Sequence, residues 1–150
     1  MSNRRLYYKQ YNLKNKKRRN EYSRKYWKLH KKSLTLYKKL KKRNNILFRI
    51  TCNLRTRINV SLRKNLKSAH TFELIGCSIK FLKSYLESKF QKGMSWSNYG
   101  YRGWHIDHIK PCALFDLSKP EEQRKCFHYT NLQPLWAEDN WQKSRKEKQE

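Results

Sequence analysis

Glycine and proline are scarce in this sequence, and neither occurs before Gly76. The 150 residues include only four glycines and three prolines. These two residue types interrupt helices most strongly, glycine through its backbone freedom and proline through its missing N–H group. Their absence from the first half of the chain therefore allows long helices there. A chain of this length predicts one compact domain with an extension.

Acidic residues are also few, because 11 Asp and Glu oppose 37 Lys and Arg and leave a net charge of +26. Such an excess of one sign repels itself unless it meets a polyanion, so we expect a nucleic acid as the partner. No uninterrupted apolar run is long enough to span a bilayer, and charges stand where a signal peptide would have its apolar core. We therefore expect a soluble, intracellular protein that does not associate with membranes.

Paired cysteines are missing as well. The chain has four scattered cysteines and no C-x-x-C pair, which argues against a zinc ribbon: Cys52, Cys77, Cys112 and Cys126. Four are too few for a disulfide scaffold in a chain of this size, so we expect them to be reduced and mostly buried. One alternative stays open, in which zinc gathers His105, Cys112, Cys126 and His128.

Positive charge is concentrated in residues 1–45, which hold 18 Lys and Arg against the single acid Glu21. Two tyrosine pairs in this segment, Tyr7 with Tyr11 and Tyr22 with Tyr26, are spaced by four and would share a helix face. We assign residues 1–45 as a basic arm that binds nucleic acid. A solvated, disordered arm and a helix that is ordered on nucleic acid are both compatible with the sequence.

Residues 46–93 are predicted to form a helical region. Apolar residues recur there every four positions, as in a helix with one apolar stripe: Ile46, Ile50, Leu54, Ile58, Leu62 and Leu66. Basic residues on the other faces could contact phosphates or simply face solvent: Arg49, Arg55, Arg57, Arg63 and Lys64. Ser78 is predicted to cap a second helix that ends near Gly93.

Residues 94–150 combine two strand patterns with a helix, so the expected fold class is α+β. The stretch HIDHI at 105–109 alternates like a strand, which places His105 and Asp107 on one face. His108 can address the same site only if the strand gives way to a loop there. NLQPLW at 131–136 predicts a second strand, and the helix predicted to follow it has acids in its first turn and cations later. Asn140, Lys143 and Ser144 share one face of that helix.

These residues predict a nuclease site. The side-chain oxygens of Asp107 and Asn140 are hard ligands suited to Mg²⁺. A neighbouring neutral imidazole, that of His108, could deprotonate a water for attack on phosphorus.

The blocks WHIDHIKP (104–111) and NLQPLWAEDNWQKS (131–144) resemble the two halves of the HNH, or ββα-metal, endonuclease signature. The form is that of the small enzymes common in phages and mobile introns, and the likeness spans residues 72–145. It implies a ββα-metal motif at residues 94–150 and, for a phage-encoded enzyme, a place in the cytoplasm of the host.

Carried over by position, the resemblance implies that Asp107 is a metal ligand and His108 the general base. Asn131 would hold the loop and orient His108. Asn140 stands where many members have a final histidine, so the chain would be an H-N-N variant with Asn140 as the second ligand. An amide oxygen is harder than imidazole, which favours Mg²⁺ or Mn²⁺.

Other residues are assigned with less direct support from the pattern. The candidate substrate contacts are His105, Lys143, Ser144, Arg55 and Arg57. Trp136 and Asp139 stand where many relatives carry a cysteine pair that binds zinc, so no structural zinc is expected.

The sequence thus predicts a DNA endonuclease or nickase that uses one divalent metal and acts on double-stranded, or else single-stranded, DNA. The alternative is a basic protein that binds nucleic acid without cutting it and retains a vestigial HNH site. The target sequence, nicking against double-strand cleavage, the biological role and the oligomeric state are left open by the sequence.

Overall fold

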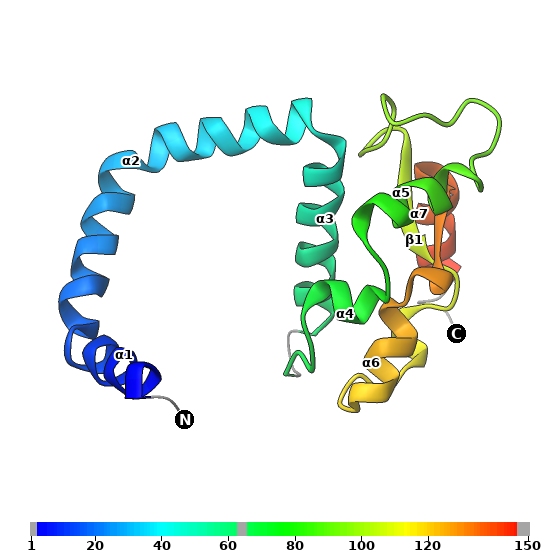
Figure 1. Ribbon diagram of the computed structural model, residues 1–150. Helices are drawn as coiled ribbons and strands as arrows, with labels where there is room; N and C mark the ends of the chain where they lie inside the picture. Colours follow the sequence, from blue (N-terminus) through cyan, green and yellow to red (C-terminus); the bar gives the residue numbers. More distant parts are fainter. Residues whose placement is uncertain (1–2, 63–65, 147–150) are drawn as a thin grey trace. The chain divides into compact units, whose positions relative to one another are not determined.

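The computed structural model describes residues 3–62 and 66–146, and it divides the chain into two units, Met1–Asn44 and Asn45–Glu150. Helices dominate both, and one antiparallel two-stranded sheet lies near the C-terminus (Figure 1). The mixture of helix and sheet predicted from the sequence is therefore confirmed. No helix among the described residues has the length and apolar character needed to cross a membrane.

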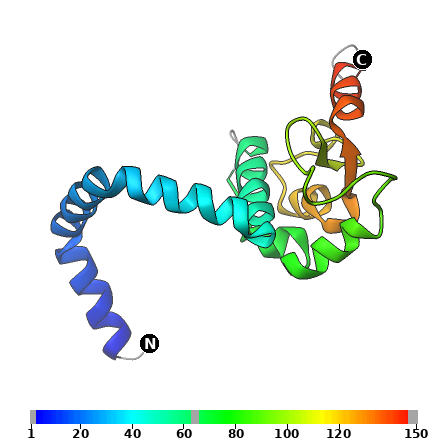
Figure 2. The ribbon, with the colours of Figure 1, turned by 90° about the horizontal axis from the view of Figure 1, so that it is seen from above.

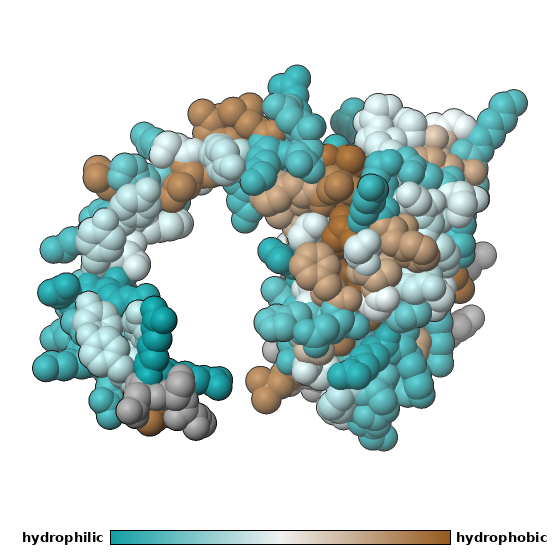
Figure 3. Space-filling view, in the orientation of Figure 1, coloured by the Kyte–Doolittle hydropathy of each residue, from teal (hydrophilic) through white to brown (hydrophobic). Residues whose placement is uncertain are grey.

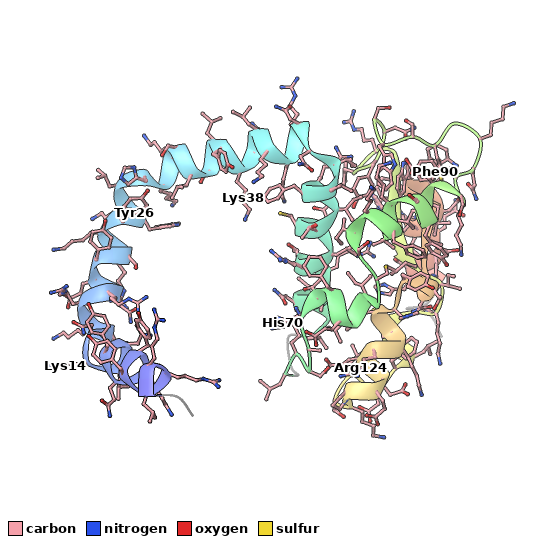
Figure 4. The ribbon with its side chains drawn as sticks, in the orientation of Figure 1. Lys14, Tyr26, Lys38, His70, Phe90 and Arg124 are labelled. Atoms are coloured by element: carbon pink, nitrogen blue, oxygen red, sulfur yellow. The ribbon has the colours of Figure 1, made fainter. Side chains whose placement is uncertain are left out.

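The described part of the N-terminal unit contains two helices, α1 (Asn3–Lys14) and α2 (Lys16–Asn44). The tyrosines spaced by four do share a face, since the rings of Tyr22 and Tyr26 stack with their centroids 6.3 Å apart. No described residue of α2 is buried. Figure 3 shows mostly hydrophilic side chains on the visible face of this unit, and Figure 4 labels Lys14, Tyr26 and Lys38 along it. These helices therefore form without an apolar core of their own.

Helix α3 (Ile46–Ser61) begins the C-terminal unit and contributes the first part of its core. Asn45 caps it, because the Asn45 side chain accepts a hydrogen bond from the Phe48 N–H group at 2.9 Å. The predicted apolar stripe is buried from Ile50 through Leu62. Leu66, however, is 94 % exposed, so its placement on the stripe was wrong: the helix ends at Ser61, and the four-residue period no longer applies beyond it. Arg63 and Lys64 lie outside the described residues.

Two short helices follow, α4 (Thr71–Ile75) and α5 (Ile79–Glu87). Gly76 ends α4 in a left-handed conformation with φ of 74°, and a Cβ there would lie 2.5 Å from the ring of His128. Both the conformation and the close ring require glycine. The predicted cap is confirmed, because the Ser78 hydroxyl accepts from the Phe81 N–H group at 3.1 Å. Helix α5 ends at Glu87, earlier than the predicted stop near Gly93.

The two predicted strands and the last helix are confirmed as β1 (Trp104–His108), β2 (Leu132–Trp136) and α7 (Ala137–Lys146). The strands are antiparallel, and Asp107 lies opposite Gln133. Three further helices connect them, and none was predicted: the 3₁₀ turns η1 (Cys112–Leu114) and η2 (Tyr129–Asn131), and α6 (Pro120–Phe127). Helix α4 lies between α3 and α6, and α7 continues directly from β2 (Figures 1 and 2).

Aromatic rings anchor the loop before β1 to the core. Trp104 is fully buried, and its ring lies 4.8 Å from that of Phe90, which Figure 4 labels. The Trp104 indole donates to the Ser95 carbonyl at 2.7 Å, and the Trp96 indole donates to the Glu87 carboxylate at 2.7 Å. These contacts fix the start of β1, the strand that presents Asp107 and His108.

Candidate functional site

Helix α7 covers the strand residues that the sequence singled out. The Asn140 amide nitrogen lies 2.9 Å from His105 Nδ1, and Lys143 Nζ lies 2.8 Å from Asp107 Oδ2. Side chains two apart on β1 therefore meet side chains three apart on α7, as the strand and helix repeats allow. The structure thus brings together His105, Asp107, Asn140 and Lys143.

Asp107 is a buried acid surrounded by cations. Asp107 is only 8 % exposed, and its Oδ2 accepts a hydrogen bond from the Lys143 ammonium. The guanidinium of Arg57, on α3, lies 3.9 Å from Asp107 Oδ1. Lys143 also donates to the main-chain carbonyls of His108 and Ile109. Burying a carboxylate costs free energy unless it is paired and hydrogen-bonded, and these contacts provide that compensation.

The donors around Asp107 fit a hard divalent ion. A positive group, the Lys143 ammonium, already sits against Asp107 Oδ2 and the His108 carbonyl, so this position accepts a cation through oxygen. Asn140, on the same helix as Lys143, has its amide nitrogen against His105 Nδ1. Oxygen donors of this kind suit Mg²⁺ or Mn²⁺.

The surroundings of His105 favour its neutral imidazole. Burial, and then the charge of Arg57, lower the pKa of His105 below its usual value. Its Nδ1 can therefore accept the hydrogen bond of the Asn140 amide. His105 thus contacts Asn140, the predicted second ligand, as a residue that orients that ligand would.

Asn131 ties the turn after β1 to the end of α6. Its side chain accepts from Lys110 N at 2.9 Å and donates to the carbonyls of Lys110 at 3.1 Å and Cys126 at 2.8 Å. Its main-chain oxygen accepts from Ile109 N at 2.8 Å. Among the described residues no hydrogen bond joins Asn131 to the His108 ring, so any orientation of that ring acts through the backbone.

His108 lies in different surroundings from Asp107. The strand continues through His108, so the loop that would let His108 share a site with Asp107 is not present at this residue. The two nitrogens of its ring lie 3.6 and 3.7 Å from Cys112 Sγ, and the ring of Phe127 is 5.9 Å away. Within the described parts of the chain, no hydrogen bond connects the His108 ring with Asp107 or Asn140.

Two cysteines complete this second cluster. Cys126 Sγ donates to Cys112 Sγ at 3.3 Å. That hydrogen bond, assisted by His108, lowers the pKa of Cys112, while the same contact and burial raise the pKa of Cys126. All four cysteines are free of disulfides, as expected, but only Cys126 is buried and the others are half-buried.

The zinc set considered from the sequence is therefore only half assembled. Cys112 and Cys126 do meet, but the histidine beside them is His108. His105 faces Asn140, and His128 pairs with the Thr130 hydroxyl at 2.8 Å. The spacing His-x-x-x-Cys at 108–112 was a signal that the sequence offered, whereas nothing in the sequence placed α6 and Cys126 beside it.

The remaining predicted contacts are spread over the C-terminal unit. Arg57 reaches Asp107. Arg55 instead lies over the ring of Phe72, with its guanidinium carbon 5.7 Å from the centroid. Ser144 is exposed on α7. Of these candidates, the structure places only Arg57 beside the acid.

Comparison with known proteins finds relatives but no family. No protein-family model matches the chain, and no solved structure does. The chain is similar to two proteins of Acanthamoeba polyphaga mimivirus, both named only as uncharacterized. One is 37 % identical over 97 residues, covering 65 % of this chain and 42 % of the relative. The other is 38 % identical over 93 residues, covering 62 % and 40 %. The chain thus spans about two fifths of the length of these relatives.

Proposed function

We propose that this protein is a metal-dependent DNA endonuclease or nickase of the HNH type. The observation that carries the proposal is the pairing of β1 with α7, in which the buried carboxylate of Asp107 meets Lys143 while Asn140 lies one turn away on the same helix. Two antiparallel strands followed by a helix are the arrangement that the resemblance implies. The large positive charge supplies the affinity for a polyanion.

In this proposal each side chain has a separate task. Asp107 and Asn140 would hold Mg²⁺ or Mn²⁺, which when bound stabilises negative charge on the departing oxygen. His108 would take the proton from the attacking water. Asn131 fixes the turn that follows His108, and Arg57 and Lys143 lie near enough to Asp107 to meet a phosphate.

Supercoiled plasmid tests the proposal directly. The full-length protein should convert it to nicked or linear DNA with Mg²⁺ and not in excess EDTA, leaving 5′-phosphate and 3′-hydroxyl ends. His108→Ala should abolish cleavage while DNA binding in a gel-shift assay stays unchanged, because one imidazole adds little to the charge that holds the duplex.

A matched control removes an exposed imidazole on the same unit, in His70→Ala. This variant should cut like the wild type. Cleavage by His108→Ala at the wild-type rate would show that His108 is not the base, and cleavage that persists in EDTA would contradict the metal requirement.

The second candidate is a basic protein that binds nucleic acid without cutting it. The observation in its favour is that the His108 ring faces Cys112, and no hydrogen bond among the described residues links it to Asp107. Plasmid that stays supercoiled at protein concentrations sufficient to bind it fully would favour this candidate.

A further inference from the structure

Three side chains with soft donor atoms converge beside the proposed nuclease site. They come from three elements, His108 at the end of β1, Cys112 at the start of η1 and Cys126 in α6. One donor atom from each lies within 4.8 Å of the other two. His108 and Cys126 are buried and Cys112 is half-buried, so the donors are largely shielded from water.

The spacing of these atoms is close to that of a tetrahedral metal site. Zinc bonds to sulfur at about 2.3 Å and to imidazole nitrogen at about 2.0 Å, so two bound sulfurs lie about 3.8 Å apart and a sulfur and a nitrogen about 3.5 Å apart. Here the sulfurs of Cys112 and Cys126 are 3.3 Å apart, and Cys112 Sγ is 3.6 Å from His108 Nδ1. Small side-chain movements would bring all three onto one ion.

The backbone already holds the three ligands together. Asn131 bonds to the Cys126 carbonyl and to both main-chain groups of Lys110, which lies between His108 and Cys112. These hydrogen bonds join the two backbone segments that carry the ligands, which lowers the cost of binding an ion. From α3, Ser61 Oγ donates a long hydrogen bond to Cys112 Sγ, at 3.9 Å.

We propose that His108, Cys112 and Cys126 form a binding site for a thiophilic divalent ion, with zinc as the biological candidate and water in the fourth position. Two thiolates and an imidazole are the donors that zinc prefers, whereas Mg²⁺ selects oxygen. The site is therefore chemically distinct from the oxygen donors at Asp107.

The site has a consequence for the proposed nuclease, and this part of the inference rests on that function. An imidazole nitrogen that is bound to zinc cannot also accept a proton from water. Zinc occupancy and general-base catalysis by His108 therefore exclude each other, so zinc would switch the cleavage off.

Cobalt(II) tests the site without any need for activity. Full-length protein, reduced with a phosphine and free of chelator, should bind one equivalent of Co²⁺ and develop a thiolate-to-cobalt charge-transfer band together with the visible bands of tetrahedral cobalt. One equivalent of Zn²⁺ should bleach both. His108→Ala and Cys112→Ser should each lose the charge-transfer band or shift it to that of a site with fewer ligands.

Two half-buried cysteines outside the cluster provide matched controls, Cys52→Ser and Cys77→Ser, which should keep the full spectrum. Cys126→Ser should lose the charge-transfer band, as Cys112→Ser does. Cys112→Ser is the decisive variant of the two, because Cys112 is half-buried whereas Cys126 is buried, so its substitution is less prone to cause misfolding. Absence of the band in the wild type, or an unchanged band in both His108→Ala and Cys112→Ser, would overturn the site.

Plasmid cleavage in Mg²⁺ then tests the switch. One equivalent of Zn²⁺ should suppress cleavage by the wild type and by Cys77→Ser, and the ratio of rates with and without zinc should move towards one in Cys112→Ser. Equal suppression in all three would overturn the switch. A cobalt spectrum as expected without any cleavage of DNA would leave the metal site standing and reject the proposed nuclease. Cleavage of DNA by a protein that shows no cobalt spectrum would support the proposed nuclease and reject the metal site.

Discussion

At the scale of single residues, the arrangement around Asp107 places an internal cation where the proposed metal would bind. The Lys143 ammonium lies 2.8 Å from Asp107 Oδ2, and Arg57 adds a second positive charge 3.9 Å from Oδ1. An ion that enters must displace the ammonium or share the carboxylate with it. Lys143 therefore sets part of the affinity for the metal, in addition to any contact with phosphate.

Replacing this lysine should strengthen metal binding. In Lys143→Met the competing charge is gone, so the affinity for Mn²⁺ should rise about 5- to 10-fold, which corresponds to about 1 kcal/mol at a partly buried site. Titration followed by electron paramagnetic resonance of free Mn²⁺ measures it. Lys119→Met removes the same charge from a surface pair with Asp116 and should leave the affinity unchanged. An affinity that is unchanged or weaker in Lys143→Met would show that ammonium and ion do not compete for Asp107.

At the scale of elements, the connection between β1 and β2 determines what surrounds His108. Helix α6 brings Cys126 and Phe127 to its ring, and Gln123 on the same helix is 1 % exposed. The Gln123 amide accepts from Ser68 N at 3.0 Å and donates to the carbonyls of Leu66 at 2.8 Å and Leu117 at 2.9 Å. One side chain thus satisfies three backbone groups and attaches α6 to the segment before α4.

Removing this amide should destabilise the C-terminal unit. Gln123→Leu keeps much of the volume but leaves three backbone groups unpaired, and we expect a loss of about 2–4 kcal/mol in the free energy of unfolding. Urea denaturation followed by circular dichroism measures it. The same substitution at the exposed Gln142 should stay within about 0.5 kcal/mol of the wild type. If both variants unfold at the same urea concentration, the hydrogen bonds of Gln123 make no net contribution to the free energy of unfolding.

The elements that the sequence predicted well are those with a regular pattern. Helix α3 showed a four-residue apolar repeat, and Ser78 marked the start of α5. HIDHI at 105–109 alternated like a strand, and its first four residues lie in β1. Helix α6 offered no such repeat, because its buried face consists of Gln123, Cys126 and Phe127 and is held largely by hydrogen bonds. A periodic pattern of apolar residues predicts a helix that buries an apolar face. It does not predict a helix that is held in place by a buried amide.

The candidate site likewise has a part that the sequence predicted and a part that it did not. The motif identified Asp107, Asn140 and Lys143, and the structure places them on facing elements. The cluster of His108 with Cys112 and Cys126 depends on how the chain returns from η1 through α6, and no spacing in the sequence encodes that return. Contacts between distant residues need the tertiary structure, even where each residue type is suggestive.

At the scale of the whole molecule, most of the net positive charge lies in one unit and the core lies in the other. Residues 1–45 hold 18 Lys and Arg, and α2 has no buried residue among those described. Every residue of the described hydrophobic core lies between Ile50 and Ala137, in the C-terminal unit. Asn45 caps α3, so a truncation that keeps the core intact should begin at Asn44 and retain this cap, which contributes about 1 kcal/mol.

Deleting residues 1–43 should separate affinity from catalysis. Each neutralised phosphate releases counterion and steepens the log–log dependence of DNA affinity on salt by about 0.9, so the truncated protein should show a clearly shallower slope. It should stay folded and still cut plasmid at low salt, with affinity reduced for all sequences alike. Fluorescence anisotropy of labelled duplex across a salt series measures both slopes, and circular dichroism reports the fold.

A triple variant separates charge from stacking in the same series. Replacing Tyr22, Tyr26 and Trp27 with alanine keeps every charge of α2, so the salt slope should equal that of the full-length protein, because stacking on bases adds affinity without releasing counterions. These side chains are exposed, so the substitution removes no buried contact. Equal slopes for the truncated and full-length proteins would mean that residues 1–43 do not touch the phosphates. Unfolding of the truncated protein would mean that these exposed helices are required by the core after all.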